Sequence, residues 1–322
     1  MRFSIVITTY NRLSLLKRSI ASALEQTVAC EVVVVDNCST DGTEDYVRSL
    51  GNQVVYHRNP ANLGHSGAVN AGVKVAKGTW IKPVDDDDYL APNCIEAMTQ
   101  AIALRPEAVI CSCQAAQVDH NGVELSRTRQ VGPGQAFYIP QADIHYGMLL
   151  EQVPFGTPIQ VAFRRDAFLE SGGWDTSLTS CDDIDSWIRI AKYGDAIFVN
   201  QCLTYRTVWP GGYDQKIALE TRMNTNILMK ERIHALVDEQ YRSAIPAIQD
   251  IRSYLRLHWG LVALKQRKVM SAMQMALPAT ASAAAWQLLL GARKGHQPNP
   301  AVRKLVLLDA QVSEKAALLT SS

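Results

Sequence analysis

Short apolar runs alternate with stretches of helical periodicity through the first third of the chain. Phe3–Thr9 and Glu31–Val35 have the composition of buried strands, and the second is a near-continuous β-branched run typical of a parallel strand. Between them, Leu13–Leu24 carries its apolar residues at helical spacing. This alternation predicts right-handed βαβ units and an α/β fold in which helices flank a mostly parallel sheet. The pattern also predicts strands at Gln53–His57, Thr79–Val84 and Ala108–Cys113, and helices at 43–50, 62–77 and 92–104.

Four consecutive carboxylates, Asp85 to Asp88, follow the strand predicted at Thr79–Val84. Two such charges ~4 Å apart repel by roughly 4 kcal/mol at an effective dielectric of about 20. A fold that gathers them must protonate some of them or supply a cation, and hard oxygen ligands suit Mg²⁺ or Mn²⁺. The strand before the cluster and Pro92 after it favour a metal site for a phosphorylated substrate over a solvated acidic loop.

Other polar residues also follow predicted strands, where parallel sheets bind their ligands. The hydroxyls of Thr8 and Thr9 and the ring of Tyr10 can hold a planar base, and Asp36 can accept a hydrogen bond from a base N–H. Each of these residues also fits an ordinary polar turn. The glycine-containing stretch that begins at Asn62 either brings backbone amides to a ligand or caps a helix.

A second acidic group, Asp182, Asp183 and Asp185, stands at the start of a predicted helix. Carboxylates are favoured there by the helix dipole, so one reading is a helix cap. The other reading is a general base that deprotonates an acceptor hydroxyl.

Composition excludes several classes of protein. The 322 residues are 47% hydrophobic with a formal net charge of +1, which is ordinary for a globular enzyme and gives no support to nucleic-acid binding. Seven scattered cysteines without a CxxC pair predict reduced thiols in a cytoplasmic protein. We expect no signal peptide before Phe3 and no membrane span in the apolar stretch 276–290. The chain also lacks GxGxxG and GxxxxGK[ST], which argues against a dehydrogenase or a P-loop enzyme.

The strand signal changes along the rest of the chain. It weakens between Gln114 and Tyr146, where Asn121-Gly122 predicts a hairpin turn, and it disappears after about residue 213. We therefore expect a catalytic domain over 1–212 and a helical C-terminal extension over 213–322. Its basic, amphipathic helices either pack on the first domain or contact a membrane surface at the inner face. Strands are predicted at Ile159–Phe163, Ala196–Val199 and Leu203–Val208, and helices at 164–170, 182–193, 217–237, 241–257 and 261–275.

Four segments resemble the inverting glycosyltransferases of family 2, which have the GT-A fold. They lie in the family's order over roughly residues 3–200, and the C-terminal helices are not covered. The segments are Ser4–Arg12, Glu31–Thr43, Asn62–Asp88 and Gly172–Arg189.

The resemblance implies a nucleotide-diphosphate sugar as donor, with uridine as the usual base. It points to Thr8, Thr9, Tyr10 and Asp36 as nucleobase contacts. The DxD motif maps onto Asp85, near the ribose, and Asp87, the ligand of Mn²⁺ or Mg²⁺; Asp86 and Asp88 remain open as ligands because the register within four aspartates is ambiguous. The family's base maps onto Asp183. We also place Asn62 and Asp86 among the donor-binding residues.

The implied reaction is a metal-dependent single displacement that inverts the anomeric centre of the sugar. The acceptor is a glycan, a lipid-linked sugar, a peptide or a small molecule, and Trp174, Trp209 and Tyr213 either line its cleft or belong to the core. The chain departs from the family at Val69, where arginine is frequent, and at Lys82-Pro83, where an apolar pair is usual. The segment Thr207–Pro210 also lacks the histidine that often completes the metal site.

Three other functions remain open at this point. The first is an Mg²⁺-dependent phosphoryl-transfer enzyme with a phosphorylated aspartate, and the second is a non-catalytic nucleotide-sugar-binding module. The third is a nucleotidyltransferase, which would release pyrophosphate. The phosphoryl-transfer reading explains neither the helix that starts at Asp182 nor the Thr8–Tyr10 segment.

Overall fold

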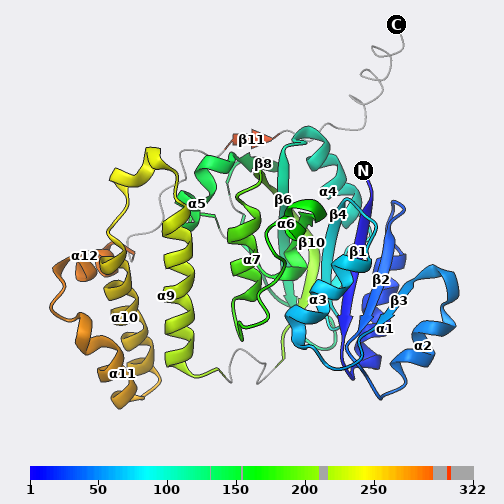
Figure 1. The fold of residues 1–322 in the computed structure, drawn as a ribbon, viewed down its shortest axis with the longest axis horizontal. Coiled ribbons are helices and arrows are strands. Elements are labelled where there is room, and N and C mark those ends of the chain that lie inside the picture. Colours follow the sequence, from blue (N-terminus) through cyan, green and yellow to red (C-terminus); the bar gives the residue numbers. More distant parts are fainter. Residues whose placement is uncertain (131, 154, 210–216, 293–302, 306–322) are drawn as a thin grey trace, which may run out of the picture.

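A single mixed sheet runs through the molecule with helices packed on both faces (Figure 1). The computed structural model describes residues 1–130, 132–153, 155–209, 217–292 and 303–305. The strand order is β11-β8-β10-β6-β9-β4-β1-β2-β3, with β5 paired to β10 and β7 paired to β6. The strands are β1 Phe3–Thr9, β2 Glu31–Asp36, β3 Val55–Arg58, β4 Trp80–Asp85, β5 Tyr89–Leu90, β6 Ala108–Val118, β7 Glu124–Arg127, β8 Ala136–Ile139, β9 Val161–Arg164, β10 Asp195–Thr207 and β11 Arg303–Leu305.

Alternate residues of the central strands enter two different cores. Ile5 and Val34 face a core that α1, α2 and α4 complete, whereas Val6 and Val33 face a core shared with α3, α5, α6 and α7. This period of two is what a strand covered on both faces requires, and the predicted α/β fold is confirmed. The helices are α1 Leu13–Leu24, α2 Thr43–Ser49, α3 Gly64–Val75, α4 Cys94–Leu104, α5 Gln141–Leu149, α6 Arg165–Glu170, α7 Asp182–Ile190, α9 Leu219–Leu236, α10 Ile248–Lys265, α11 Val269–Ala276 and α12 Ala283–Ala292, with 3₁₀ turns at η1 Gly51–Gln53, η2 Pro158–Gln160, η3 Glu239–Ala244 and η4 Leu277–Ala279.

The parallel strands β3, β2, β1 and β4 determine where the polar residues meet. In the register of the sheet, Thr8 lies beside Asp85, and Thr9 lies beside Asp36. Three strands thus end at one edge, and the turns that follow them carry the candidate ligands.

Lys82 departs from the apolar pattern of β4 because its ammonium group is satisfied inside the protein. The side chain is fully buried, and Nζ donates to the backbone carbonyls of Pro83, Pro158 and Ile159. These bonds tie β4 to η2, so the strand continues to Asp85 despite its charged residue.

Several expected boundaries were wrong. The two strands predicted at 196–199 and 203–208 form one strand, β10, because register shifts near Cys202 absorb the polar residues between them. The break expected before Leu261 does not occur: Gly260 lies inside α10, where an added Cβ would come within 2.7 Å of the Ala276 Cβ on α11. The glycine allows two helices to approach closely. The α5 and α12 helices were not predicted.

The C-terminal helices share a core with the sheet domain. Met229 and Ile233 of α9 belong to the same buried cluster as Trp187 of α7, and α10 then carries α11 and α12 at the far end of the molecule (Figure 1). The expected domain boundary at 212/213 lies outside the described residues, so the division remains a proposal. Within the described part of the chain, no helix is both long and apolar enough to span a membrane.

Candidate active site

The four aspartates after β4 have different environments. Asp86 and Asp88 are buried, and each is held by the protein: Thr9 Oγ1 donates to Asp86 at 2.8 Å, and the Thr207 amide donates to Asp88 at 2.8 Å. Asp85 and Asp87 reach solvent, with side chains 34% and 15% exposed. The structure therefore presents Asp85 and Asp87 to a ligand and leaves Asp88 with a structural role.

Crowding sets the charge state of this cluster. Burial raises the pKa of Asp86 to about 6. Burial and the repulsion of Asp85 raise the pKa of Asp87, and the same causes hold the pKa of Asp88 well above its usual range. Arg12 opposes this by placing NH1 3.2 Å from Asp86 Oδ1 and 3.0 Å from Asp87 Oδ2. The cluster favours binding of additional positive charge.

The residues expected at the nucleobase surround the same edge. Thr8 and Thr9 are buried under the acidic cluster, while Tyr10 is 45% exposed. Asp36 is fully buried; its oxygens accept from the Ser39 amide, Tyr56 and Arg58.

Asn62 lies in the turn before α3. Its Oδ1 accepts from Asn37 Nδ2 at 2.7 Å and from the Gly64 amide at 2.9 Å. These bonds fix the turn from which α3 starts. The side chain of Asn62 thus stabilises the turn before α3, whose N-cap is Leu63, and its assignment to the donor stays a prediction.

His65 joins the two acidic groups of the chain. Its Nε2 lies 2.8 Å from Asp85 Oδ1, and its Nδ1 lies 3.6 Å from Asp182 Oδ2. Partial burial disfavours the imidazolium, but the Asp85 and Asp182 carboxylates outweigh it and raise the pKa of His65 well above its ordinary value. The start of α3 therefore places a cation between the end of β4 and the start of α7.

The neighbouring carboxylates Asp182 and Asp183 have opposite pKa shifts. Burial alone would raise the pKa of Asp182, but the nearby His65 imidazole and a hydrogen bond from Ser66 lower it. Burial and the adjacent Asp182 charge raise the pKa of Asp183 to about 7. Pairs separated in this way are typical of acid–base sites, and a pKa near 7 suits a general base.

The loop before α7 is fixed by α3. Asn70 Nδ2 donates to the Trp174 carbonyl, and the Trp174 amide donates to Asn70 Oδ1, at 2.9 and 2.8 Å. Gly173 has φ +73°, and an added Cβ would lie 2.7 Å from Asn70 Oδ1, so this position requires glycine. Trp174 is buried and packs edge-on against His65.

Asp185 holds α7, the helix that carries the candidate base Asp183, in its position. It is fully buried, accepts from Arg189 Nε and NH2 at 2.8 and 2.6 Å, and pairs with Arg232 of α9. The arginines reach it from α7 itself and from the C-terminal helices. The orientation of α7 is thus determined jointly by both parts of the chain.

Replacing Asp185 by asparagine is expected to lower the free energy of unfolding by about 2–3 kcal/mol, because charge-assisted hydrogen bonds to two arginines are lost. Urea denaturation measures the change. Asp175→Asn is the matched control, since Asp175 faces Arg232 at 3.6 Å but is 31% exposed, and we expect a loss below about 1 kcal/mol. Equal losses in the two variants would contradict this role for Asp185.

The carboxylates of Asp85 and Asp87 fit a divalent ion whose other ligands come from a substrate. Within the described residues, no group of three or more His, Cys, Asp or Glu side chains is arranged to hold a metal ion. Mg²⁺ is often bound through one or two carboxylates, with substrate phosphates and water completing its coordination. Asp87 and Asp85 match that arrangement in chemistry and exposure.

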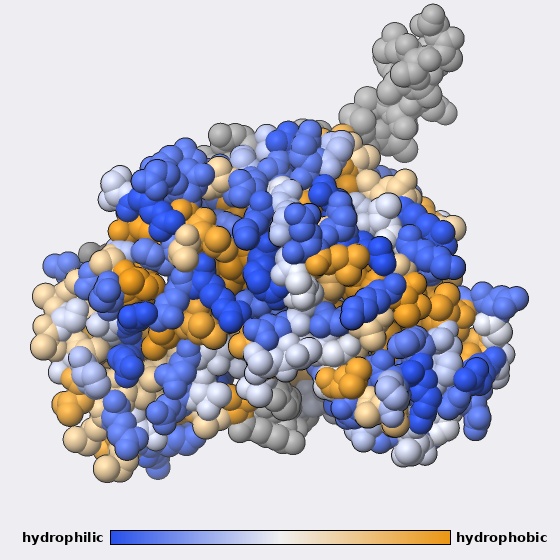
Figure 2. All heavy atoms as spheres, viewed as in Figure 1, coloured by the Kyte–Doolittle hydropathy of each residue, from blue (hydrophilic) through white to orange (hydrophobic). Residues whose placement is uncertain are grey.

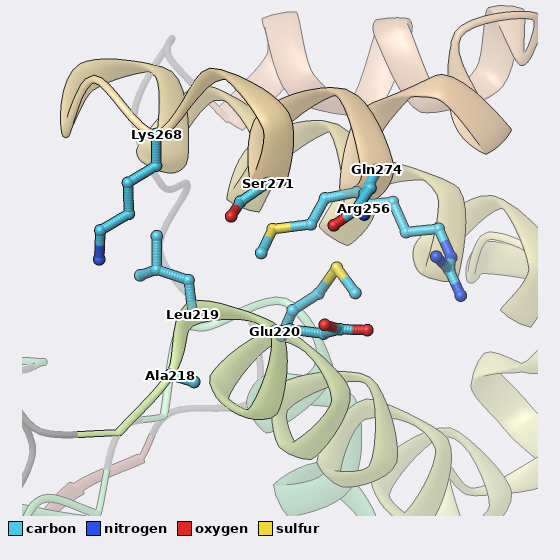
Figure 3. A pocket seen from close by; sticks show the side chains of 9 residues that line it. Ala218, Leu219, Glu220, Arg256, Lys268, Ser271 and Gln274 are labelled. Atoms are coloured by element: carbon cyan, nitrogen blue, oxygen red, sulfur yellow. The ribbon is translucent and has the colours of Figure 1, made fainter.

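Two cavities lie outside the acidic cluster. One of about 350 Å³ lies between α9, α10 and α11, where Leu219 and Glu220 face Arg256 and Lys268 (Figure 3). The other, of about 650 Å³, is bordered by the loop Gly172–Thr176 and the C-terminal half of α7. Neither cavity is lined by Asp85, Asp87 or Asp183, so we locate the candidate site by the chemistry of the sheet edge.

Three contacts at this edge were not predicted. From the sequence, His65 belongs only to a helix-opening stretch, Arg12 to the turn after the first strand, and Trp209 to the acceptor cleft or the core. Trp209 Nε1 instead donates to Asp87 Oδ2 at 2.9 Å. Tyr213 lies outside the described residues. A histidine directly after the glycine that opens a helix was the one available signal for His65.

Two solved structures have a fold similar to this one. Staphylococcus aureus TarS 1–349 in complex with UDP-GlcNAc has a TM-score of 0.60 and 17% identity, over 86% of this chain and 90% of that one. The mannosyltransferase PcManGT from Pyrobaculum calidifontis, in complex with GDP-Man and Mn²⁺, has a TM-score of 0.55 and 20% identity, over 91% of this chain and 80% of that one. The fold is therefore the GT-A fold.

The chain belongs to glycosyl transferase family 2, whose family model matches residues 4–172. A curated relative, an uncharacterized glycosyltransferase of Haemophilus influenzae, is 27% identical over 209 residues, covering 63% of this chain and 67% of the relative. The chain is thus a glycosyltransferase, and the resemblance inferred from the sequence is confirmed.

Proposed function

We propose that this chain transfers a sugar from a nucleoside-diphosphate donor to an acceptor hydroxyl by a metal-dependent displacement that inverts the anomeric centre. The observation that supports this most strongly is the position of His65, which contacts Asp85 at the end of β4 and Asp182 at the start of α7. Only the imidazole ring of His65 would separate a diphosphate beside Asp85 from the segment that carries Asp183. Donor and base are then on opposite sides of one site.

The donor side comprises Thr8, Thr9, Tyr10, Asp36, Asn62, Asp85 and Asp86. We propose uridine as the base, and TarS, which was solved with UDP-GlcNAc, supports this assignment. PcManGT was solved with GDP-Man, so guanosine is the alternative. The binding test given below for the base also identifies the sugar.

The proposed chemistry assigns separate roles to the two acidic groups. A Mn²⁺ or Mg²⁺ ion held by Asp87 and Asp85 would supply positive charge to the diphosphate oxygens as the glycosidic bond breaks. Asp183 takes the proton of the acceptor hydroxyl as that oxygen attacks the anomeric carbon. Asp182 stays ionised through its ion pair with His65 and its hydrogen bond from Ser66, which keeps the pKa of Asp183 high enough to hold the proton.

A thermal-shift panel of nucleotides and nucleotide sugars with Mn²⁺ tests the donor. A ligand that binds only the folded chain adds ~2.7 kcal/mol of stability at a hundredfold excess over Kd. We expect one uridine-diphosphate sugar to raise the melting temperature more than UDP alone, and this rise to disappear with EDTA. A panel without any metal-assisted shift would contradict the proposal.

The acceptor is proposed only by class: a glycan, a lipid-linked sugar, a peptide or a small molecule. The alternatives of a phosphoryl-transfer enzyme and a nucleotidyltransferase receive no support from the family membership. Measured turnover would contradict the alternative of a non-catalytic nucleotide-sugar-binding module. A cytoplasmic location, expected from the cysteine pattern, stays a prediction.

A further inference from the structure

Charge is strongly segregated along this chain. Residues 251–308 contain nine lysines and arginines and no aspartate or glutamate. The rest of the chain holds 23 basic and 31 acidic residues and so carries −8, although the whole chain is nearly neutral. A run of this kind is typical of a segment that meets an anionic partner.

The helix α11 exposes an apolar stripe within this basic segment. Met270, Met273 and Leu277 are 71%, 55% and 66% exposed and lie at i, i+3 and i+7, so they share one face. Ala272 and Met275, on the opposite face, are buried against α9 and α10. The stripe is therefore the outer face of a helix whose inner face is already packed.

Two cations stand at the start of this stripe. Lys265 at the end of α10 and Arg267 in the turn into α11 are exposed, and neither forms an ion pair with another described residue. The next residue, Lys268, lines the cavity between α9, α10 and α11 and is not part of this surface. Figure 2 shows hydrophobic residues exposed over α11 and α12 at the left-hand end of the molecule, with hydrophilic residues among them.

We propose that this α11 surface, formed by Lys265, Arg267, Met270, Met273 and Leu277, binds the surface of an anionic phospholipid bilayer. Lysine and arginine would contact lipid phosphates while the apolar stripe enters the boundary between headgroups and acyl chains. Unbranched methionine side chains adapt to such a disordered environment. The inference does not depend on the proposed function.

The charges favour a bilayer over the other candidate occupants. A second copy meeting this surface about a two-fold axis would bring the same cations, Lys265 and Arg267, against each other, which is unfavourable. A nucleic acid would satisfy the cations but offers no apolar layer for Met270 and Met273. An anionic bilayer satisfies both halves of the surface.

Vesicle sedimentation with the full chain, without donor or acceptor, tests the proposal. We expect binding to vesicles of phosphatidylcholine with about one third phosphatidylglycerol, weak binding to phosphatidylcholine alone, and loss of binding as salt is raised. The double variant Lys265→Gln, Arg267→Gln should lower the partition coefficient about 25-fold, because each basic residue near an anionic surface contributes roughly fivefold.

A second variant removes the apolar half of the surface. Met270→Ser, Met273→Ser and Leu277→Ser together should bring binding close to background while the far-UV spectrum stays unchanged. Val123→Ser with Leu125→Ser is the matched control, since both residues are 59% exposed on the hairpin between β6 and β7. For the cations, Lys74→Gln with Lys77→Gln changes the same number of exposed charges elsewhere. Both control variants should bind like the parent chain.

Three outcomes would overturn the proposal. The first is no sedimentation with either vesicle, and the second is equal, salt-insensitive binding to both. The third is self-association in analytical ultracentrifugation that the serine variant abolishes, without vesicle binding; a second copy would then be the occupant. If the serine variant fails to fold, the glutamine variant and the salt series still decide between these results.

Discussion

Replacing Asp183 with asparagine is expected to lower the turnover number about 10²–10⁴-fold, the range typical of a positioned general base. Asparagine keeps the shape of the side chain and its bond from the Ile184 amide but cannot take a proton. Initial rates of product formation at saturating donor measure the effect. Donor affinity should change little, because the donor contacts lie on the other side of His65.

The pH profile gives a more specific test of the same residue. Asp183 acts when it is ionised and its pKa is raised to about 7, so kcat/KM should be lost as pH falls through 7 and level off above it. Asp182→Asn removes the neighbouring charge that raises this pKa, so the acid limb of the profile should move to lower pH. An unchanged acid limb in Asp182→Asn, or full activity of Asp183→Asn, would show that another group is the base.

Replacing Asp87 with asparagine should lower kcat/KM at least about 10²-fold, the scale on which preorganised charge stabilisation acts in enzymes. EDTA should inactivate the parent chain, and Mn²⁺ should restore it. Calorimetric titration of Mn²⁺ in the presence of the nucleoside diphosphate should show weaker binding to the variant. Retained metal-dependent activity in Asp87→Asn would move the metal ligand to another aspartate.

Asp88→Asn is the matched control for the metal site. Asp88 is buried, and the Thr207 amide donates to its Oδ1, a bond that asparagine can keep. Burial and the charges of Asp85 and Asp87 hold the pKa of Asp88 high, so a neutral side chain fits its environment. We expect metal affinity near that of the parent chain. A loss of metal affinity equal to that of Asp87→Asn would show that Asp88 also takes part in the metal site.

Local patterns were sufficient to predict much of the fold. The helix expected at Leu13–Leu24 has those bounds, and β1 agrees with the strand expected at Phe3–Thr9, because both have clear periodicity and polar residues at their ends. Tertiary packing decided the rest. Gly260 continues a helix only because α11 needs the space, and β10 stays continuous only through a bulge supported by its neighbour β6.

The acidic residues of the candidate site could be predicted, but the contacts that bring them together could not. Strand ends and helix starts are visible in a sequence, which is why Asp85, Asp87 and Asp183 could be named. Whether α3 and α7 meet is a property of the folded chain: His65 lies 117 positions before Asp182, and no local pattern predicts their contact. The roles of Arg12 and Trp209 at Asp87 depend on the same long-range geometry.

The ion pair between Asp185 and Arg232 has a consequence for exchanging parts between relatives. The family match ends at residue 172, so a chimera joined there would keep the matched segment whole. The helix that carries the candidate base and its arginine partner on α9 both follow that junction. A graft that takes α7 from one parent and α9 from another would leave a buried carboxylate facing an unmatched surface. Recombination experiments on this enzyme should therefore transfer everything from Gly173 through Leu236 as one block.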